Sequence, residues 1–347
     1  MVVPEQVIAN LAASLDAVVL AVQTETAIER TSSENVPVSG KEIRKELNEA
    51  ASALRMKATS VGLLWADPSN KPKLQEASSL LSEYEQTVAR ICNLCLRVLS
   101  GAGKSLRASI LGFAKALVEA STRLLGVLED GSMHGQLTTL TGVVWEACDA
   151  AKTLPTDNKA AINRRLTQAA KSVKDAVREA NEMKDSWKPS GVGEDDEGDE
   201  PDFQAGSDDE DLDFEAEALS AEETAVAEAA VQLASRLLDA LKALLKVWLS
   251  AELPDGDVAG VGRREEVLQQ SLGSSAAAEN LVAALYAPQD PDEVERAAAD
   301  ILTHWKAARE RAEGEECAKA AEGLESLLGA TDVLKASVAT LRGSKAD

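Results

Sequence analysis

The sequence is poor in the residue types that several fold and function classes require. Aromatic residues make up 3% of the 347 residues, and β-branched residues never gather into alternating runs, so a β-rich fold is not expected. The sequence has 2 histidines and contains neither a G-x-S-x-G nor an H-E-x-x-H motif. These absences favour a protein that is not an enzyme, although acid–base chemistry by paired carboxylates stays open.

Apolar runs and basic clusters are also short. The longest apolar runs, such as Ala17 to Val22, are too short to cross a bilayer, and Glu5 and Asp16 interrupt any signal-peptide pattern. We therefore expect no membrane association. The sequence pI of about 4.6 argues against nucleic-acid binding, which needs a basic patch. Without a secretory signal, the 4 cysteines are expected to be reduced thiols.

Acidic residues are plentiful, and they concentrate in one tract. No Lys, Arg or His occurs from Pro189 to Ser235, whereas much of the net charge of -23 falls there. Because crowded like charges repel and cannot bury apolar surface, residues 189–217 are predicted to form a flexible, disordered linker. The predicted fold is all-α, with two antiparallel helical bundles. Residues 1–188 would form five or six helices, and residues 218–347 four or five.

Helical periodicity runs through both flanking regions. It is clearest in the third predicted helix, with apolar residues at Leu74, Ala77, Leu81, Tyr84, Val88, Ile91, Cys95 and Val98. Pro155 and Asp157 predict the start of a helix near residue 157, with Asn158 and Lys159 exposed on its first turn. Ser220 and Glu223 have the spacing of a capping box. Beyond them, the pattern predicts helices at about 263–272, 276–286, 291–312 and 316–341.

Two motifs suggest chemistry but fit structural roles better. Residues 98–105, VLSGAGKS, resemble a phosphate-binding loop but lack its first glycine and a preceding strand, so a glycine-rich interhelical turn is favoured. Cys92 and Cys95 form a C-x-x-C motif inside a predicted helix, and the other Cys and His residues do not have zinc-ligand spacing. Small core residues are therefore the favoured interpretation, and no metal or cofactor is expected.

One stretch of the sequence carries a more specific pattern than these motifs. Residues 143–185 read VVWEACDAAKTLPTDNKAAINRRLTQAAKSVKDAVREANEMKD. Their Trp-x-Ala-Cys and Pro-x-Asp-Asn-Lys-Ala-Ala elements are similar to the signature of the cyclin-D1-binding protein family. Members of that family are described as Id-like helix-loop-helix factors. A second similarity is LVAALYAP at residues 281–288, and the acidic insert also fits.

The resemblance implies both a fold and a function. It implies helical bundles similar to those of talin and vinculin, a location in the cytoplasm and nucleus, binding of D-type cyclins and helix-loop-helix factors, and restraint of the cell cycle. No basic segment precedes a helix-loop-helix, so direct DNA binding is not expected. A cytoskeletal adaptor of the talin or vinculin type is the alternative function.

Four candidate site residues lie in the stretch that carries this resemblance, and a fifth lies in the acidic tract. Trp145, Asp157, Asn158 and Lys159 are the suspected partner-binding residues. The alternative is that the Asp157 motif only fixes a corner between helices. Ser207 precedes Asp208-Asp209-Glu210 and is a suspected phosphorylation site for an acid-directed kinase. A plain solvated spacer is the alternative for the acidic tract.

Overall fold

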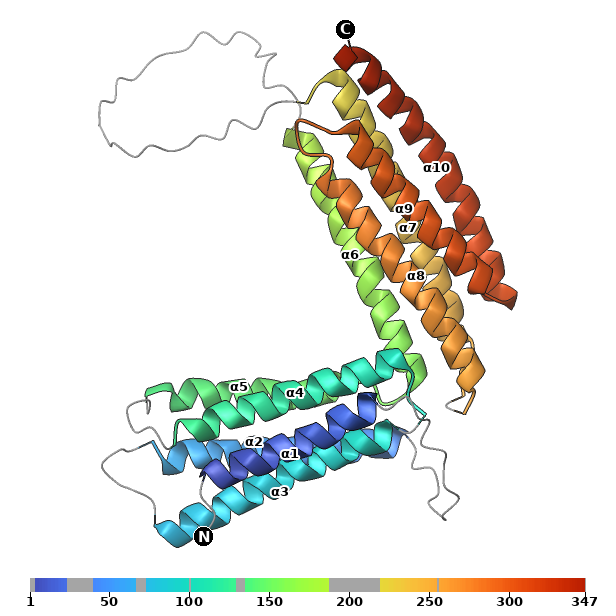
Figure 1. The fold of residues 1–347 in the computed structure, drawn as a ribbon. Coiled ribbons are helices and arrows are strands. Elements are labelled where there is room, and N and C mark those ends of the chain that lie inside the picture. Colours follow the sequence, from blue (N-terminus) through green and yellow to red (C-terminus); the bar gives the residue numbers. More distant parts are fainter. Residues whose placement is uncertain are drawn as a thin grey trace, which may run out of the picture. The chain divides into compact units, whose positions relative to one another are not determined.

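The structure is a computed structural model that describes residues 4–23, 40–66, 73–99, 101–128, 135–186, 219–254 and 256–346 (Figure 1). Every regular element in these ranges is a helix, so the prediction of an all-α fold is confirmed. The elements are α1 (Pro4–Gln23), α2 (Gly40–Leu64), α3 (Leu74–Val98), α4 (Lys104–Gly126), α5 (Leu137–Asp149), the 3-10 helix η2 (Ala150–Thr153), α6 (Asn158–Ser186), α7 (Ala221–Ser250), α8 (Val258–Ala283), α9 (Pro291–Arg311) and α10 (Gly314–Ala346).

Packing divides the chain into two compact units. Unit 1 consists of residues 1–164 and 252–265, and unit 2 consists of residues 165–251 and 266–347. The predicted first domain, 1–188, contains all of α6, whereas packing assigns α6 to unit 2 from Arg165 onward. The linker at 189–217 lies outside the described residues, so the predicted domain division stays a prediction.

In the described part of unit 1, helices α1 to α5 pack in a closed ring. α2 packs on α3, α3 on α1, α1 on α4, α4 on α5, and α5 again on α2. The predicted stripe of α3 faces this core from Leu81 to Val98, whereas Leu74 at the start of the helix is exposed. Each fully buried leucine side chain contributes about 1.5–3 kcal/mol of apolar burial. One polar pair lies in the core, where the Tyr84 hydroxyl and Ser121 Oγ are 2.9 Å apart.

Unit 2 is built around two tryptophans. Trp248 of α7 and Trp305 of α9 are fully buried, and Trp305 Nε1 donates to the carbonyl of Ala320 on α10 at 2.9 Å. A Cβ at Gly323 of α10 would lie 2.8 Å from Ala240 Cβ of α7. Glycine at this position therefore lets α10 pack closely on α7, its main neighbour.

The prediction of two helices at 263–272 and 276–286 is wrong, because α8 is one helix through both. The small residues between them suit close packing within unit 2. A Cβ at Gly273 would meet the His304 ring at 2.6 Å, and Ser274 and Ser275 are buried, with hydroxyls that donate to the carbonyls of Ile301 and Ala169. Tertiary contacts therefore outweigh the turn-forming character of this sequence.

Candidate functional site

The side chain of Trp145 marks a face that α5 and α2 form together in unit 1. Trp145 is half-buried, and its Nε1 donates to Thr59 Oγ1 of α2 at 3.2 Å. The guanidinium carbon of Arg55, also on α2, lies 4.9 Å from the centre of the tryptophan ring. A cation over an indole face is favourable, so the two side chains hold each other in place. We call the surface around Arg55, Met56, Thr59, Leu63 and Trp145 the α2–α5 face.

Ion pairs fix the edge of the α2–α5 face. Arg55 Nη1 donates to both carboxylate oxygens of Asp149 at 3.0 Å, and Lys152 Nζ donates to Asp149 Oδ1 at 2.7 Å. The hydrogen bond from Lys152, helped by the Arg55 charge, lowers the pKa of Asp149. All three groups are substantially exposed, so these pairs contribute little stability. Their main effect is to orient Arg55 against the tryptophan.

Apolar side chains stand exposed on the α2 side of this face. Met56 and Leu63 are 65% and 73% exposed. They sit seven positions apart, which places them on the same side of α2. Gly62, which precedes Leu63 on α2, lies where α2 meets α5. A Cβ at this position would lie 2.7 Å from Thr141 Oγ1 of α5, so the two helices approach closely. The result is a rigid, helix-based surface that combines an aromatic, an arginine and exposed apolar groups, all on described residues.

A second polar arrangement lies at the start of α6. Asp157 Oδ1 accepts a hydrogen bond from Ala160 N at 2.7 Å, so the predicted role of Asp157 at the helix start is confirmed. The predicted exposure of Asn158 is wrong, because this residue is 2% exposed. Asn158 Oδ1 accepts from Gly103 N at 2.7 Å, and Asn158 Nδ2 donates to the carbonyl of Gly101 at 3.0 Å. The asparagine therefore fastens the turn between α3 and α4.

Glu265 completes this corner from far along the chain. Its Oε1 accepts from Ser105 N and its Oε2 accepts from Ser105 Oγ, both at 2.7 Å, although the residues are 160 positions apart. A carboxylate is favourable there because the N-terminus of α4 carries a partial positive charge. In a phosphate-binding loop, these donors would hold a phosphate. Here a buried carboxylate occupies them, so VLSGAGKS is an interhelical turn, as favoured from the sequence.

Gly103 is needed at this corner for space. A Cβ there would lie 2.7 Å from Val261 Cγ1 and 2.9 Å from Glu265 Oε1. Gly101 is needed for its backbone, which has a φ of 75°. We call Gly101, Gly103, Ser105, Asn158 and Glu265 the Asn158 corner. Glu265 could not be predicted from the sequence, because no local pattern connects it to a turn so far away in the chain.

The predicted site residues therefore fall into two groups. Trp145 lies on the α2–α5 face, Asn158 lies in the Asn158 corner, and Asp157 caps the start of α6 beside that corner. Lys159 follows them on the first turn of α6 and is partly exposed. No contact joins the two groups into one constellation within the described ranges, and Ser207 lies outside them. Arg55, Asp149 and Glu265 were not predicted from the sequence, because their roles depend on helix packing.

The buried thiols are poor candidates for chemistry. Burial raises the pKa of Cys92 to about 11, and burial together with Cys92 raises that of Cys95 to about 12. Burial likewise raises the pKa of Cys148 to about 12. Such thiols stay protonated at neutral pH, and the thiolate is the reactive form. Among the described residues, no group of three or more His, Cys, Asp or Glu residues is arranged to hold a metal ion.

The α2–α5 face and much of the Asn158 corner lie in a segment that matches a known family. Residues 46–186 match the family model described as "Grap2 and cyclin-D-interacting, N-terminal". The protein named cyclin-D1-binding protein 1 homolog from Danio rerio is 28% identical over 149 residues, which are 42% of this chain and 43% of that protein. Residues 46–186 of this chain are therefore similar to this family.

The match covers only part of this chain and part of its relative. The chain spans less than half of the length of the cyclin-D1-binding relative. The cyclin-D-interacting family segment contains Trp145, Asp157, Asn158 and Lys159, but it stops before Glu265 and before most of unit 2. None of the helices in the described ranges is long and apolar enough to cross a membrane.

Proposed function

We propose that this chain is a non-enzymatic, protein-binding regulator and that the α2–α5 face is its binding surface. The family match supports the binding role, because it covers this face and describes a cyclin-D-interacting family. The single observation that carries the choice of surface is Trp145, half-buried and held against Arg55 on two packed helices. Tryptophan and arginine dominate the energetics of protein interfaces, and a rigid surface loses little entropy on binding.

The proposed partners are D-type cyclins or helix-loop-helix factors. The name of the Danio rerio relative describes binding to cyclin D1, and that name supports the first choice. Restraint of the cell cycle and a location in the cytoplasm and nucleus are the finer parts of the proposal, supported by the family resemblance. Fluorescence microscopy of the tagged full chain tests the location, and a signal restricted to one other compartment would overturn it.

A matched pair of substitutions tests the binding surface. Met56 and Leu74 are both 65% exposed and both lie on helices of unit 1, but only Met56 belongs to the α2–α5 face. Titration calorimetry with a purified D-type cyclin should show weaker binding for Met56→Ala and unchanged binding for Leu74→Ala. Truncating an exposed side chain leaves stability within about 0.5 kcal/mol, so a change in affinity would report on the surface itself.

Other outcomes would count against the proposal. Equal affinities for the two variants would reject the α2–α5 face. Binding to neither D-type cyclins nor helix-loop-helix factors, together with cosedimentation with actin filaments, would reject the regulator and favour a cytoskeletal adaptor. A variant of Asn158 would disturb the Asn158 corner, so its affinity must be measured where it remains folded, whereas Lys159→Glu changes a partly exposed side chain on the same first turn of α6.

A further inference from the structure

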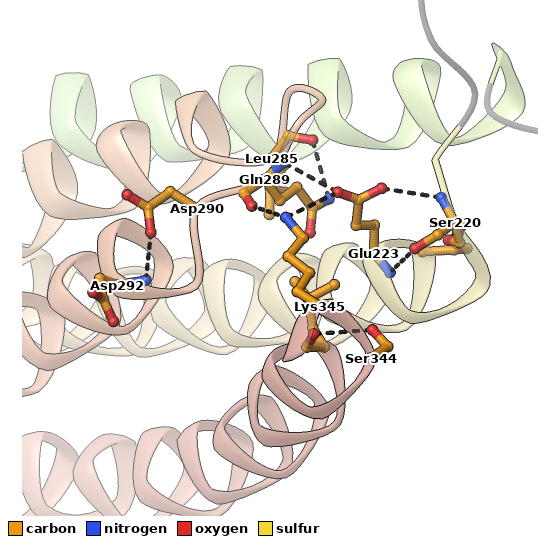
Figure 2. Close-up of polar contacts among 10 residues, drawn as sticks. Ser220, Glu223, Leu285, Gln289, Asp290, Asp292, Ser344 and Lys345 are labelled. Carbon is orange, nitrogen blue, oxygen red and sulfur yellow. Dashed lines mark hydrogen bonds and ion pairs between the residues drawn. The ribbon is translucent and has the colours of Figure 1, made fainter. Parts of the chain in front are cut away.

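Ser220 is the N-cap residue of α7, where its backbone and side chain form a local pair of hydrogen bonds. Ser220 Oγ accepts from Glu223 N at 3.1 Å, and Ser220 N donates to Glu223 Oε2 at 3.1 Å (Figure 2). This reciprocal arrangement is a capping box, as the spacing in the sequence predicted. Ser220 itself is exposed, whereas Glu223 is 8% exposed.

The other oxygen of Glu223 connects two further segments of unit 2. Glu223 Oε1 accepts from Gln289 N at 3.2 Å, and Lys345 Nζ lies 3.5 Å from the same oxygen. Lys345 Nζ also donates to the carbonyl of Gln289 at 2.7 Å. Figure 2 shows these groups converging from α7, the segment before α9, and the last turn of α10. We call Ser220, Glu223, Gln289 and Lys345 the Glu223 cluster.

The charges in the Glu223 cluster are closely balanced. The buried carboxylate of Glu223 is matched by the ammonium of Lys345 and by two backbone N–H groups. Arg342, one turn earlier on α10, is engaged with Asp292 and Glu295 of α9. An added anion next to Glu223 would therefore compete with it for Lys345. A buried carboxylate that loses its cation is costly, so the cluster is sensitive to such a change.

The sequence after Ser220 suits a kinase that selects acidic substrates. Glu222 and Glu223 follow at the second and third positions, and Glu215 and Glu217 precede Ser220. Charge patterns of this kind discriminate between kinase substrates. Since the Ser220 residue is exposed at a helix end rather than buried in the bundle, its hydroxyl can be reached from solvent.

We propose that Ser220 is a phosphorylation site for an acid-directed protein kinase and that a phosphate there opens the Glu223 cluster. The γ-phosphoryl group of ATP is transferred to Ser220 Oγ. The bond between the γ-phosphorus and the bridging oxygen of ATP breaks, a phosphorus–oxygen bond to Oγ forms, and ADP and the hydroxyl proton leave.

The product changes the electrostatics of the Glu223 cluster. A phosphate ester carries about -1.5 to -2 charges at neutral pH, attached one residue from the first turn of α7. It draws Lys345 away from Glu223 and repels the Glu223 carboxylate from Ser220 N. The link between the last turn of α10 and the segment before α9 then weakens, because it depends on Lys345. Phosphorylation thus loosens one end of α10 without removing its apolar contacts.

The test uses the full chain, ATP and a purified acid-directed serine/threonine kinase. Tandem mass spectrometry should place a phosphate on Ser220. Ser220→Asn is the matched variant, because asparagine caps helices as well as serine does but cannot accept the phosphate. The Ser220→Asn variant should lack the phosphate at position 220, whereas the Ser207→Ala variant should still be phosphorylated on Ser220. A folded chain with no phosphate on Ser220, or with phosphate only at Ser207 or other residues, would overturn the proposal.

Hydrogen exchange tests the consequence separately. The amides of Ser220 and Gln289 both donate to Glu223 and should lose protection in the phosphorylated chain. The buried interior of α7, around Leu237 and Leu241, should keep its protection. Unchanged exchange at Ser220 and Gln289 in a chain phosphorylated at Ser220 would contradict the opening of the cluster.

Discussion

Asn158 of the Asn158 corner and Trp145 of the α2–α5 face lie in the same stretch of sequence, yet the two side chains differ in what they can reach. Asn158 is buried, and its amide oxygen and nitrogen are both used on backbone groups of one turn. Trp145 is held by Thr59 and Arg55 but stays partly open to solvent. Asn158, committed to the turn, therefore lies 13 positions along the chain from Trp145, which is available to a partner.

This difference shows that a sequence signature can combine unrelated roles. The family-like motif around Asp157 and Asn158 starts a helix and fixes a turn. These are the contacts expected if the motif holds a corner between helices. The Trp145 part of the same signature lies on an accessible face. Substitutions in the corner should therefore change stability, and substitutions on the face should change binding.

The largest expected effect is at Asn158. Asn158→Ala removes both hydrogen bonds to the turn and leaves Gly103 N without its partner, so we expect a loss of about 2–4 kcal/mol in the free energy of unfolding. Chemical denaturation measures this loss. Lys159→Ala, the neighbouring control, should change stability by less than about 0.5 kcal/mol. Equal stabilities for the two variants would show that the corner does not depend on Asn158.

Glu265 should be almost as important for unit 1. Glu265→Ala leaves the buried Ser105 hydroxyl and Ser105 N without their acceptor, with an expected cost of about 2–3 kcal/mol. The neighbouring Glu266→Ala is the control, since Glu266 makes a long, exposed contact with Arg311. A thermal melt that is lowered equally by both variants would contradict the role of Glu265 at the corner.

Gly103→Ala tests the space at the corner rather than its hydrogen bonds. The added methyl group would lie 2.7 Å from Val261 Cγ1, so it must displace a packed side chain. We expect a loss of about 1–3 kcal/mol in unfolding free energy. Gly112→Ala on α4 is the control, because nothing lies within 4 Å of a Cβ there. A Gly103→Ala variant as stable as Gly112→Ala would mean that the turn can move aside.

The smallest expected effect is a pH dependence in unit 2. Burial raises the pKa of Glu223, but hydrogen bonds from Ser220 N and Gln289 N and the charge of Lys345 outweigh it, so the net pKa is lowered from 4.5. A lowered pKa in the folded state stabilises the protein above the unfolded value and loses this contribution as pH falls below 4.5 through the folded pKa.

Glu223→Gln makes this contribution measurable. Denaturation at neutral pH should show the wild type to be more stable than Glu223→Gln, and the difference should shrink as the pH falls below 4.5. Many other carboxylates titrate in this range, so only the difference between the two chains reports on Glu223. A difference that stays constant with pH would contradict the assignment.

The features that could be predicted from the sequence are those that depend on interactions between residues close together in the chain. The apolar stripe of α3, the helix start at Asp157 and the capping box of Ser220 and Glu223 each depend on residues within a few turns of one another. The all-α fold follows from the same periodicity. These features need no knowledge of which helices are neighbours.

The parts that could not be predicted depend on packing between distant segments. Asn158 is buried because the turn at Gly101 and Gly103 folds over it, and α8 continues through Gly273 because His304 packs there. Glu265 reaches Ser105 across 160 positions. The Trp145 part of the site was found from a family resemblance, whereas its partner Arg55 becomes evident only once α2 and α5 lie together.

The most direct test compares affinity and stability in two variants of the full chain. Trp145→Ala and Asn158→Ala would each be titrated with a purified D-type cyclin at a temperature where both remain folded, and their unfolding free energies would be measured in parallel. We expect Trp145→Ala to weaken binding at least about tenfold, as loss of an interface tryptophan commonly does, and Asn158→Ala to lose stability but keep its affinity. Full affinity in Trp145→Ala, with weakened binding in folded Asn158→Ala, would contradict the separation of the binding face from the structural corner.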